Sequence, residues 1–376
     1  MTLNRRPQPS SDDRELRLWR VGRALSVTFA AAVLAAGGVF YGLVYLLDFQ
    51  EIDTTAKLDA KTLFDLVKLS FGVVAGAGAL VALVVAYRRQ RVDETGAHRE
   101  ATRLHTERFS QAVDKLGSDS PAVRLGGVHA LAGLADDAPD DSLRQTCIDV
   151  LCAYLQLPFT PDPGDDPAHQ EEHHRYLAFR KVRHTILRLI GDHCRLPRGT
   201  YRSWQGCDLD LTDVIIDGSM DFRGAVLSSG RVSFSGATFP GGEVFFDRAS
   251  FSGGRVFFDR ASFSGGKVSF LRASFSGGLV FFDRASFSGG KVSFLRASFS
   301  GGLVSFDRAA FSDGEVSFRE ASFSGGRTSF NHASFSGGAV SFTTASGPAP
   351  YGLLGAVGTP APATVTLSFA WMHPVP

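Results

Sequence analysis

The sequence predicts a protein of mixed class, in which two transmembrane helices precede a small all-α bundle and a solenoid of stacked short β-strands. Three observations predict it. Two long apolar stretches lie near the N-terminus, residues 93–195 place apolar side chains at helical spacing, and ten consecutive twelve-residue units fill residues 225–344. Such strict repetition outweighs local propensity, because a unit this small buries its apolar face only by stacking on its neighbours.

The two apolar stretches are residues 24–47, which carry no charged side chain, and residues 69–87. Each is long enough to span about 30 Å of hydrocarbon. The first is too long for the apolar core of a cleaved signal peptide, and a second stretch follows it. Helices of soluble proteins rarely lack a polar face. We therefore predict two transmembrane helices that place the chain in the lipid bilayer.

Basic residues at the ends of these stretches predict the orientation. Arg20 and Arg23 end the basic segment 1–23, and Arg88, Arg89 and Arg91 follow the second stretch. The connecting loop, residues 48–68, has more acidic than basic side chains. Positive charge marks the cytoplasmic side of membrane proteins. The prediction is a multi-pass protein of the cell membrane with both termini in the cytoplasm and a short external loop.

Residues 93–195 read as a helical bundle. A first apolar pattern stops at Gly117, Ser120-Pro121 resembles a helix start, and a third helix begins near Ser142. A loop rich in proline and aspartate, 158–167, separates the third helix from a fourth over 171–190. The prediction is four helices between the membrane and the solenoid.

Each twelve-residue unit reads as two short strands. Ala249 and Phe251 are two residues apart, as are Val256 and Phe258, so each pair points to one face of an extended strand. Less regular inward pairs begin at Leu209, and the predicted solenoid covers 207–344. The predicted inward ladder comprises Phe251, Phe258, Phe263, Phe270, Phe275, Phe282, Phe287, Phe294, Phe299 and Phe306.

The unit resembles the pentapeptide-repeat family, whose step is a small residue, any residue, a central Leu or Phe, and two more residues. Four such steps make one square coil of a right-handed β-helix in that family. The resemblance implies a right-handed quadrilateral β-helix with about 24 residues per coil, because two units of this chain fill one coil and Gly-Gly pairs turn two of its corners.

A finer resemblance adds the order of the segments. Two apolar stretches, the motifs at 107–117 and 122–131, and then the ladder are similar to membrane-anchored pentapeptide-repeat proteins of actinomycete-type bacteria. The resemblance implies no catalytic residues. We predict no catalytic site, no cofactor and no metal.

Histidines and basic residues in the helical region keep other chemistry open. His169, His173, His174, His184, His193 and Cys194 invite a zinc hypothesis, but they lack the spacing of a zinc site. Basic residues gather on the fourth helix as Arg175, Arg180, Lys181, Arg183 and Arg188. They fit either a solvated face or contact with phosphate or anionic lipid.

Charge on the repeat bears on the remaining alternative. Some pentapeptide-repeat proteins resemble DNA by shape and acidic surface and bind gyrase-type topoisomerases, whereas residues 225–344 hold twelve basic and eight acidic residues. This excess argues against DNA mimicry and makes nucleic acid an unfavoured partner. Adjacent Asp and Arg residues are expected to neutralise each other at one corner.

The sequence thus favours a non-enzymatic membrane-tethered scaffold or protein-interaction module whose protein partner is unknown. The alternatives are a nucleic-acid or topoisomerase-binding protein and, third, an enzyme or metal site in the helical domain. The segment 345–376, rich in Pro, Gly and Ala, is either a partial cap on the last coil or a disordered extension. Homo-oligomers through the spans or the solenoid end stay open.

Overall fold

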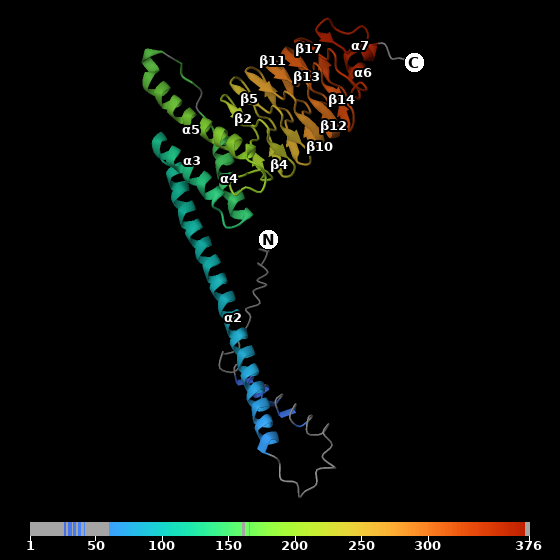
Figure 1. Ribbon diagram of the computed structural model, residues 1–376. Coiled ribbons are helices and arrows are strands. Elements are labelled where there is room, and N and C mark those ends of the chain that lie inside the picture. Colours follow the sequence, from blue (N-terminus) through green and yellow to red (C-terminus); the bar gives the residue numbers. More distant parts are fainter. Residues whose placement is uncertain are drawn as a thin grey trace, which may run out of the picture. The chain divides into compact units, whose positions relative to one another are not determined.

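A computed structural model describes residues 26–27, 29–31, 33–34, 37–38, 41, 60–159, 162–164 and 166–372 (Figure 1). The chain divides into two compact units, 1–100 and 101–376. The second unit contains the helices α3 (Pro121–Asp136), α4 (Asp141–Gln156) and α5 (Gln170–Arg195), followed by a β-solenoid.

The long helix α2, Ala60–Leu116, changes the interpretation of the N-terminal region. The stretch 69–87 is not a helix of its own, because α2 is 57 residues long and continues through Arg88, Arg89 and Arg91 to Leu116. No helix in the described part of the chain has the length and apolar character needed to cross a membrane. The prediction of two transmembrane helices in a multi-pass membrane protein is therefore wrong. Most of the first apolar stretch, 24–47, lies outside the described residues.

Helices α3 to α5 begin where local chemistry favours a helix start. Pro121 is the first residue of α3, where its missing N–H costs nothing. The Asp140 carboxylate accepts a hydrogen bond from the Leu143 N–H at 2.9 Å and caps α4. Helix α5 follows a short 3₁₀ turn, Pro167–His169, and ends five residues beyond the predicted helix. Buried Leu131, Ile148, Leu151, Ile186 and Ile190 contribute to the core of these three helices.

The solenoid consists of two parallel nine-stranded sheets. The first contains β1 (Leu209–Asp210), β3 (Val226–Leu227), β4 (Arg231–Ser233), β6 (Ser250–Phe251), β7 (Arg255–Phe257), β10 (Ser274–Phe281), β12 (Ser298–Ser305), β14 (Ser322–Phe323) and β15 (Arg327–Ser329). The second contains β2 (Met220–Asp221), β5 (Glu243–Phe245), β8 (Ser262–Phe263), β9 (Lys267–Ser269), β11 (Ser286–Ser293), β13 (Ala310–Ser317), β16 (Ser334–Phe335), β17 (Ala339–Ser341) and β18 (Val365–Thr366).

Strand pairing fixes the length of a coil. Val256 pairs with Val280, and Val280 with Val304, so each strand lies beside the strand 24 residues further on. The solenoid has about seven turns, more than the five coils of the ten regular units, because irregular turns precede and follow them. Some strands continue through the Gly-Gly pairs and others break there. β10 passes through Gly277 and Gly278, whereas Gly253 and Gly254 separate β6 from β7. A Cβ at Gly277 would meet the Ser252 carbonyl oxygen at 2.4 Å.

Phenylalanine rings fill the solenoid in columns that run along its axis. Phe246, Phe270 and Phe294 stack at 4.9 and 4.7 Å between ring centroids, with interplanar angles of 5° and 3°. A second column, which includes Phe258 and Phe282, meets the first edge-to-face, as in the Phe270–Phe282 pair at 5.9 Å. Both arrangements are favourable for aromatic pairs.

Both ends of the solenoid are covered. At the N-terminal end, Gly191 of α5 approaches the backbone so closely that a Cβ would meet the Asp221 carbonyl oxygen at 2.6 Å. At the C-terminal end, the short helices α6 (Leu353–Val357) and α7 (Phe369–Met372) follow the last coil. The Trp371 ring lies 5.7 Å from Phe342, and its indole N–H donates to the Gly347 carbonyl at 2.8 Å. Segment 345–376 therefore contains a cap through Met372.

Candidate binding groove on the solenoid

The structure places the predicted ladder phenylalanines and some of the arginines beside the apolar stretches. All ten ladder phenylalanines are at most 2 % exposed, so they form the core and are not available to a ligand. Arg88, Arg89 and Arg91 are exposed on α2. Arg20 and Arg23 lie outside the described residues.

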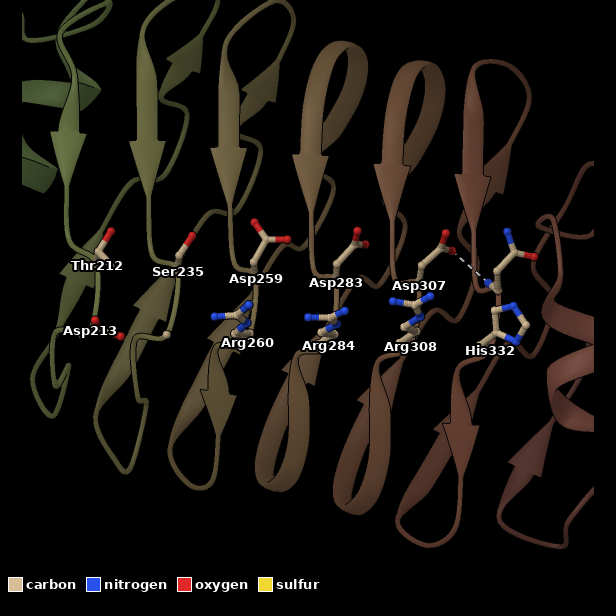
Figure 2. A pocket seen from close by; sticks show the side chains of 12 residues that line it. Thr212, Asp213, Ser235, Asp259, Arg260, Asp283, Arg284, Asp307, Arg308 and His332 are labelled. Atoms are coloured by element: carbon tan, nitrogen blue, oxygen red, sulfur yellow. Dashed lines mark hydrogen bonds between the residues drawn. The ribbon is translucent and has the colours of Figure 1, made fainter.

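A groove of about 750 Å³ runs along one corner of the solenoid, where strands of the first sheet end. Two rows of charged side chains line its centre (Figure 2). One row consists of Asp259, Asp283 and Asp307, and the other of Arg260, Arg284 and Arg308. Neutral side chains flank the aspartate row, namely Thr212 and Ser235 before it and Asn331 after it; Asp213, Gly236 and His332 flank the arginine row.

The aspartates are half-buried and differ in their partners. The Ser305 hydroxyl donates to Asp283 and the Ser329 hydroxyl donates to Asp307, each at 2.5 Å. Beside Asp259, the position that Ser305 and Ser329 occupy in the later coils is taken by Phe281, which has no hydroxyl to donate. Burial, together with the neighbouring Asp283 charge, raises the pKa of Asp259 to about 6.

The arginines are exposed at the rim and share an unusual backbone conformation. Arg260, Arg284 and Arg308 have φ of 56°, 57° and 59°, in the left-handed region that non-glycine residues seldom adopt. No ion pair joins the aspartate row to the arginine row in the described residues. The expected neutralisation of each aspartate by the arginine next to it in the sequence is therefore not found. The guanidinium groups remain available to a partner.

The groove can therefore make charge-assisted hydrogen bonds of both signs. Its carboxylates accept and its guanidinium groups donate, once per coil and at the spacing of parallel strands. In the described residues, no three His, Cys, Asp or Glu side chains lie close enough together to hold a metal ion, and the row of aspartates is no exception. The arrangement is suited to binding a repetitive charged surface.

Three histidines of the helical region contact separate carboxylates. His173 pairs with Asp162 at 2.7 Å, and His184 with Asp217 at 2.9 Å. His193 is buried, stacks on Trp204 at 4.2 Å and lies 3.2 Å from Asp136. They do not converge on one point.

His193 is a structural residue of the junction between helices and solenoid. Its Nδ1 lies 2.7 Å from the Leu189 carbonyl and its Nε2 faces the Asp136 carboxylate, so the protonated ring donates from both nitrogens. Burial alone would lower the pKa of His193, but hydrogen bonds to Asp136 and Leu189 outweigh burial and raise it. The Trp204 indole N–H donates to the same carboxylate at 3.2 Å.

The cysteines have little nucleophilic character. Cys147 and Cys152 are buried, and burial raises their pKa to about 11 and about 12, while Cys194 is shifted in the same direction. A thiolate is the nucleophilic form, and it is scarce at neutral pH for such groups.

No family model, curated protein or solved structure matches the chain. The β-solenoid with its regular phenylalanine ladder fits a pentapeptide-repeat protein. The finer resemblance to membrane-anchored members of actinomycete-type bacteria is not supported.

Proposed function

We propose that this protein is a non-enzymatic interaction scaffold that binds a second copy of itself through the charged groove. A β-solenoid is compatible with a repeat scaffold or interaction module, and solenoid repeat folds are typically non-enzymatic. The observation that carries the proposal is the pair of matched rows, three aspartates beside three arginines, with no ion pair between them in the described residues.

Spacing favours a second solenoid over other partners. Charges in each row repeat from one parallel strand to the next, about 4.8 Å apart. Side chains on one side of an extended peptide repeat at about 6.6 Å, and those four apart on a helix at about 6 Å. A partner with the same strand spacing stays in step along the whole row, and a second copy of this chain has it.

Symmetry makes the two grooves complementary. A two-fold axis parallel to the solenoid axis places the arginine row of one copy opposite the aspartate row of the other. Each copy then contributes three arginines to three aspartates of its partner. A shift by one coil would leave an arginine of each copy facing a neutral residue such as Ser235 or Asn331, so the flanking residues set the register.

The expected association is weak and sensitive to salt. An exposed ion pair contributes about 0.2–1 kcal/mol, so the six pairs together contribute about 1–6 kcal/mol. A contribution of about 6 kcal/mol corresponds to a dissociation constant of about 40 µM, and about 4 kcal/mol corresponds to about 1 mM. We therefore expect a dissociation constant between about 40 µM and 1 mM, rising as salt shortens the screening length from about 10 Å at 0.1 M to about 3 Å at 1 M.

Nucleic acid is not favoured by this groove. A phosphate backbone that reached the arginines would also lie beside the aspartate row, where like charges repel. No described feature specifically favours a topoisomerase, so we do not advance that alternative.

Sedimentation equilibrium of the full chain tests the proposal. The groove variant carries Arg260→Asn, Arg284→Asn and Arg308→Asn, because Asn tolerates the left-handed region. A matched control makes the same three changes at Arg248, Arg272 and Arg296, which have φ of 55°, 56° and 56° at the opposite corner.

We expect wild type and the control to dimerise reversibly at low salt and the groove variant to stay monomeric. Equal association of the two variants would refute the proposal, as would a wild-type chain that is monomeric at about 1 mM, the weak limit of the expected range.

A further inference from the structure

A second cavity, of about 490 Å³, lies among the helices and is independent of the groove. Its walls include the aromatic side chains Phe159, Tyr176 and Phe179 and the arginines Arg124 and Arg183. The Phe159 and Tyr176 rings lie 5.2 Å apart at an angle of 30°. The cavity thus combines flat apolar surfaces with positive charge.

Arg183 is the unusual member of this lining. Its side chain is on α5 and the residue is 5 % exposed, yet the described chain gives its guanidinium no hydrogen bond and no ion pair. Arg180, one turn earlier, pairs instead with Asp217 at 2.6 Å. The Arg183 guanidinium carbon instead lies over the Phe159 ring, 4.9 Å from the ring centroid.

An unpaired buried guanidinium is unfavourable unless another group compensates it. Burial lowers the pKa of Arg183, because desolvation disfavours the charged form. A cation–π contact with Phe159 offsets part of this cost. A bound anion would offset more, because a guanidinium fork pairs with a carboxylate or phosphate through two parallel hydrogen bonds.

A second arginine reinforces the positive potential of the cavity. Arg124 donates from Nη1 to the Tyr154 hydroxyl at 3.1 Å, and its guanidinium lies 4.6 Å from the Phe179 ring centroid. Arg175 also lines the cavity. The acidic member of the lining is Glu172, whose residue is exposed, so basic side chains outnumber it.

We propose that this cavity is a binding site for a small organic anion with a flat apolar body. The carboxylate or phosphate group of the ligand pairs with Arg183, and the ring of the ligand lies against Phe159, Tyr176 and Phe179. The site would give the protein a small-molecule ligand that its solenoid does not imply.

Isothermal titration calorimetry of the full chain tests this site with four probes. Benzoate and phenyl phosphate carry both the ring and the charge, benzamide carries the ring alone, and acetate carries the charge alone. The variants are Arg183→Met, which keeps much of the volume without charge, and Arg183→Lys, which keeps the charge without the fork. Arg188→Met is the control, because Arg188 is on the same helix and pairs with Asp192 outside the cavity.

We expect saturable binding of benzoate, phenyl phosphate or both, and binding at least about tenfold weaker for benzamide and acetate. Arg183→Met should weaken the aromatic anions at least about tenfold, Arg183→Lys should weaken them less, and Arg188→Met should leave them unchanged. The site would be disproved by unchanged binding in either Arg183 variant, by benzamide binding as well as benzoate, or by no binding of either aromatic anion at about 10 mM.

Discussion

Truncation of one ladder ring, Phe275→Ala, tests how the solenoid is held together. Phe275 is fully buried and stacks between Phe251 and Phe299 at 4.7 Å on each side. Removing a buried Phe side chain costs about 3–5 kcal/mol through lost burial and the cavity that remains. We expect the upper part of that range, because paired strands on both sides keep the coil from collapsing into the cavity.

Urea unfolding of the full chain followed by circular dichroism measures this cost, with Phe281→Ala as the control. Phe281 is half-buried on the outside of the same strand and stacks on Phe257 at 5.5 Å, so its loss should cost less than about 2 kcal/mol. If Phe275→Ala and Phe281→Ala reduced the free energy of unfolding equally, the inward ladder would not be the source of stability.

Three further predictions concern titration and the cap. The raised pKa of Asp259 means that the folded state binds more protons than the unfolded state, so the free energy of unfolding should fall as pH rises from about 4 to about 6. Asp259→Asn should remove this contribution to the pH dependence. Phe281→Ser should supply the missing hydroxyl donor and thereby lower the pKa of Asp259 in a carboxyl NMR titration. The raised pKa of His193 has the same sign in a higher window: its stabilisation is complete below about pH 6.5 and is lost as pH rises through the folded-state pKa, so urea unfolding of His193→Gln should lack that loss. Trp371→Ala should speed hydrogen exchange around Phe323 and Phe342, whose rings Trp371 contacts, whereas Phe369→Ala, at a residue 73 % exposed, should not. Equal exchange in both variants would show that the cap does not protect the last coil.

The β-solenoid was predictable from the sequence, because positions 24 residues apart carry the same side-chain type. Val256, Val280 and Val304 occupy one position of successive coils and pair in register. The helix start at Pro121 was equally visible, since a proline favours the first turn. Patterns that act between near neighbours, or that repeat strictly, carry over directly into structure.

Features that depend on distant contacts were not predictable. No glycine at position 284 signals a left-handed backbone, so the sequence did not show that Arg284 adopts one. The Arg284 side chain was therefore expected to pair with Asp283. Arg183 read as part of a basic face that was either solvated or in contact with phosphate or anionic lipid, but packing against Phe159 of a preceding loop buries it. The stretch 69–87 read as a membrane span because hydropathy within a window does not show that the helix continues to Leu116.

An exchange of charges between two chains tests the central proposal most directly. One variant replaces Asp259, Asp283 and Asp307 by Arg, and the other replaces Arg260, Arg284 and Arg308 by Asp. Each variant alone has two like-charged rows, so sedimentation equilibrium at low salt should find each monomeric, while an equimolar mixture should form a heterodimer. A mixture that stays monomeric, or a single variant that dimerises as well as wild type, would contradict pairing of the two grooves.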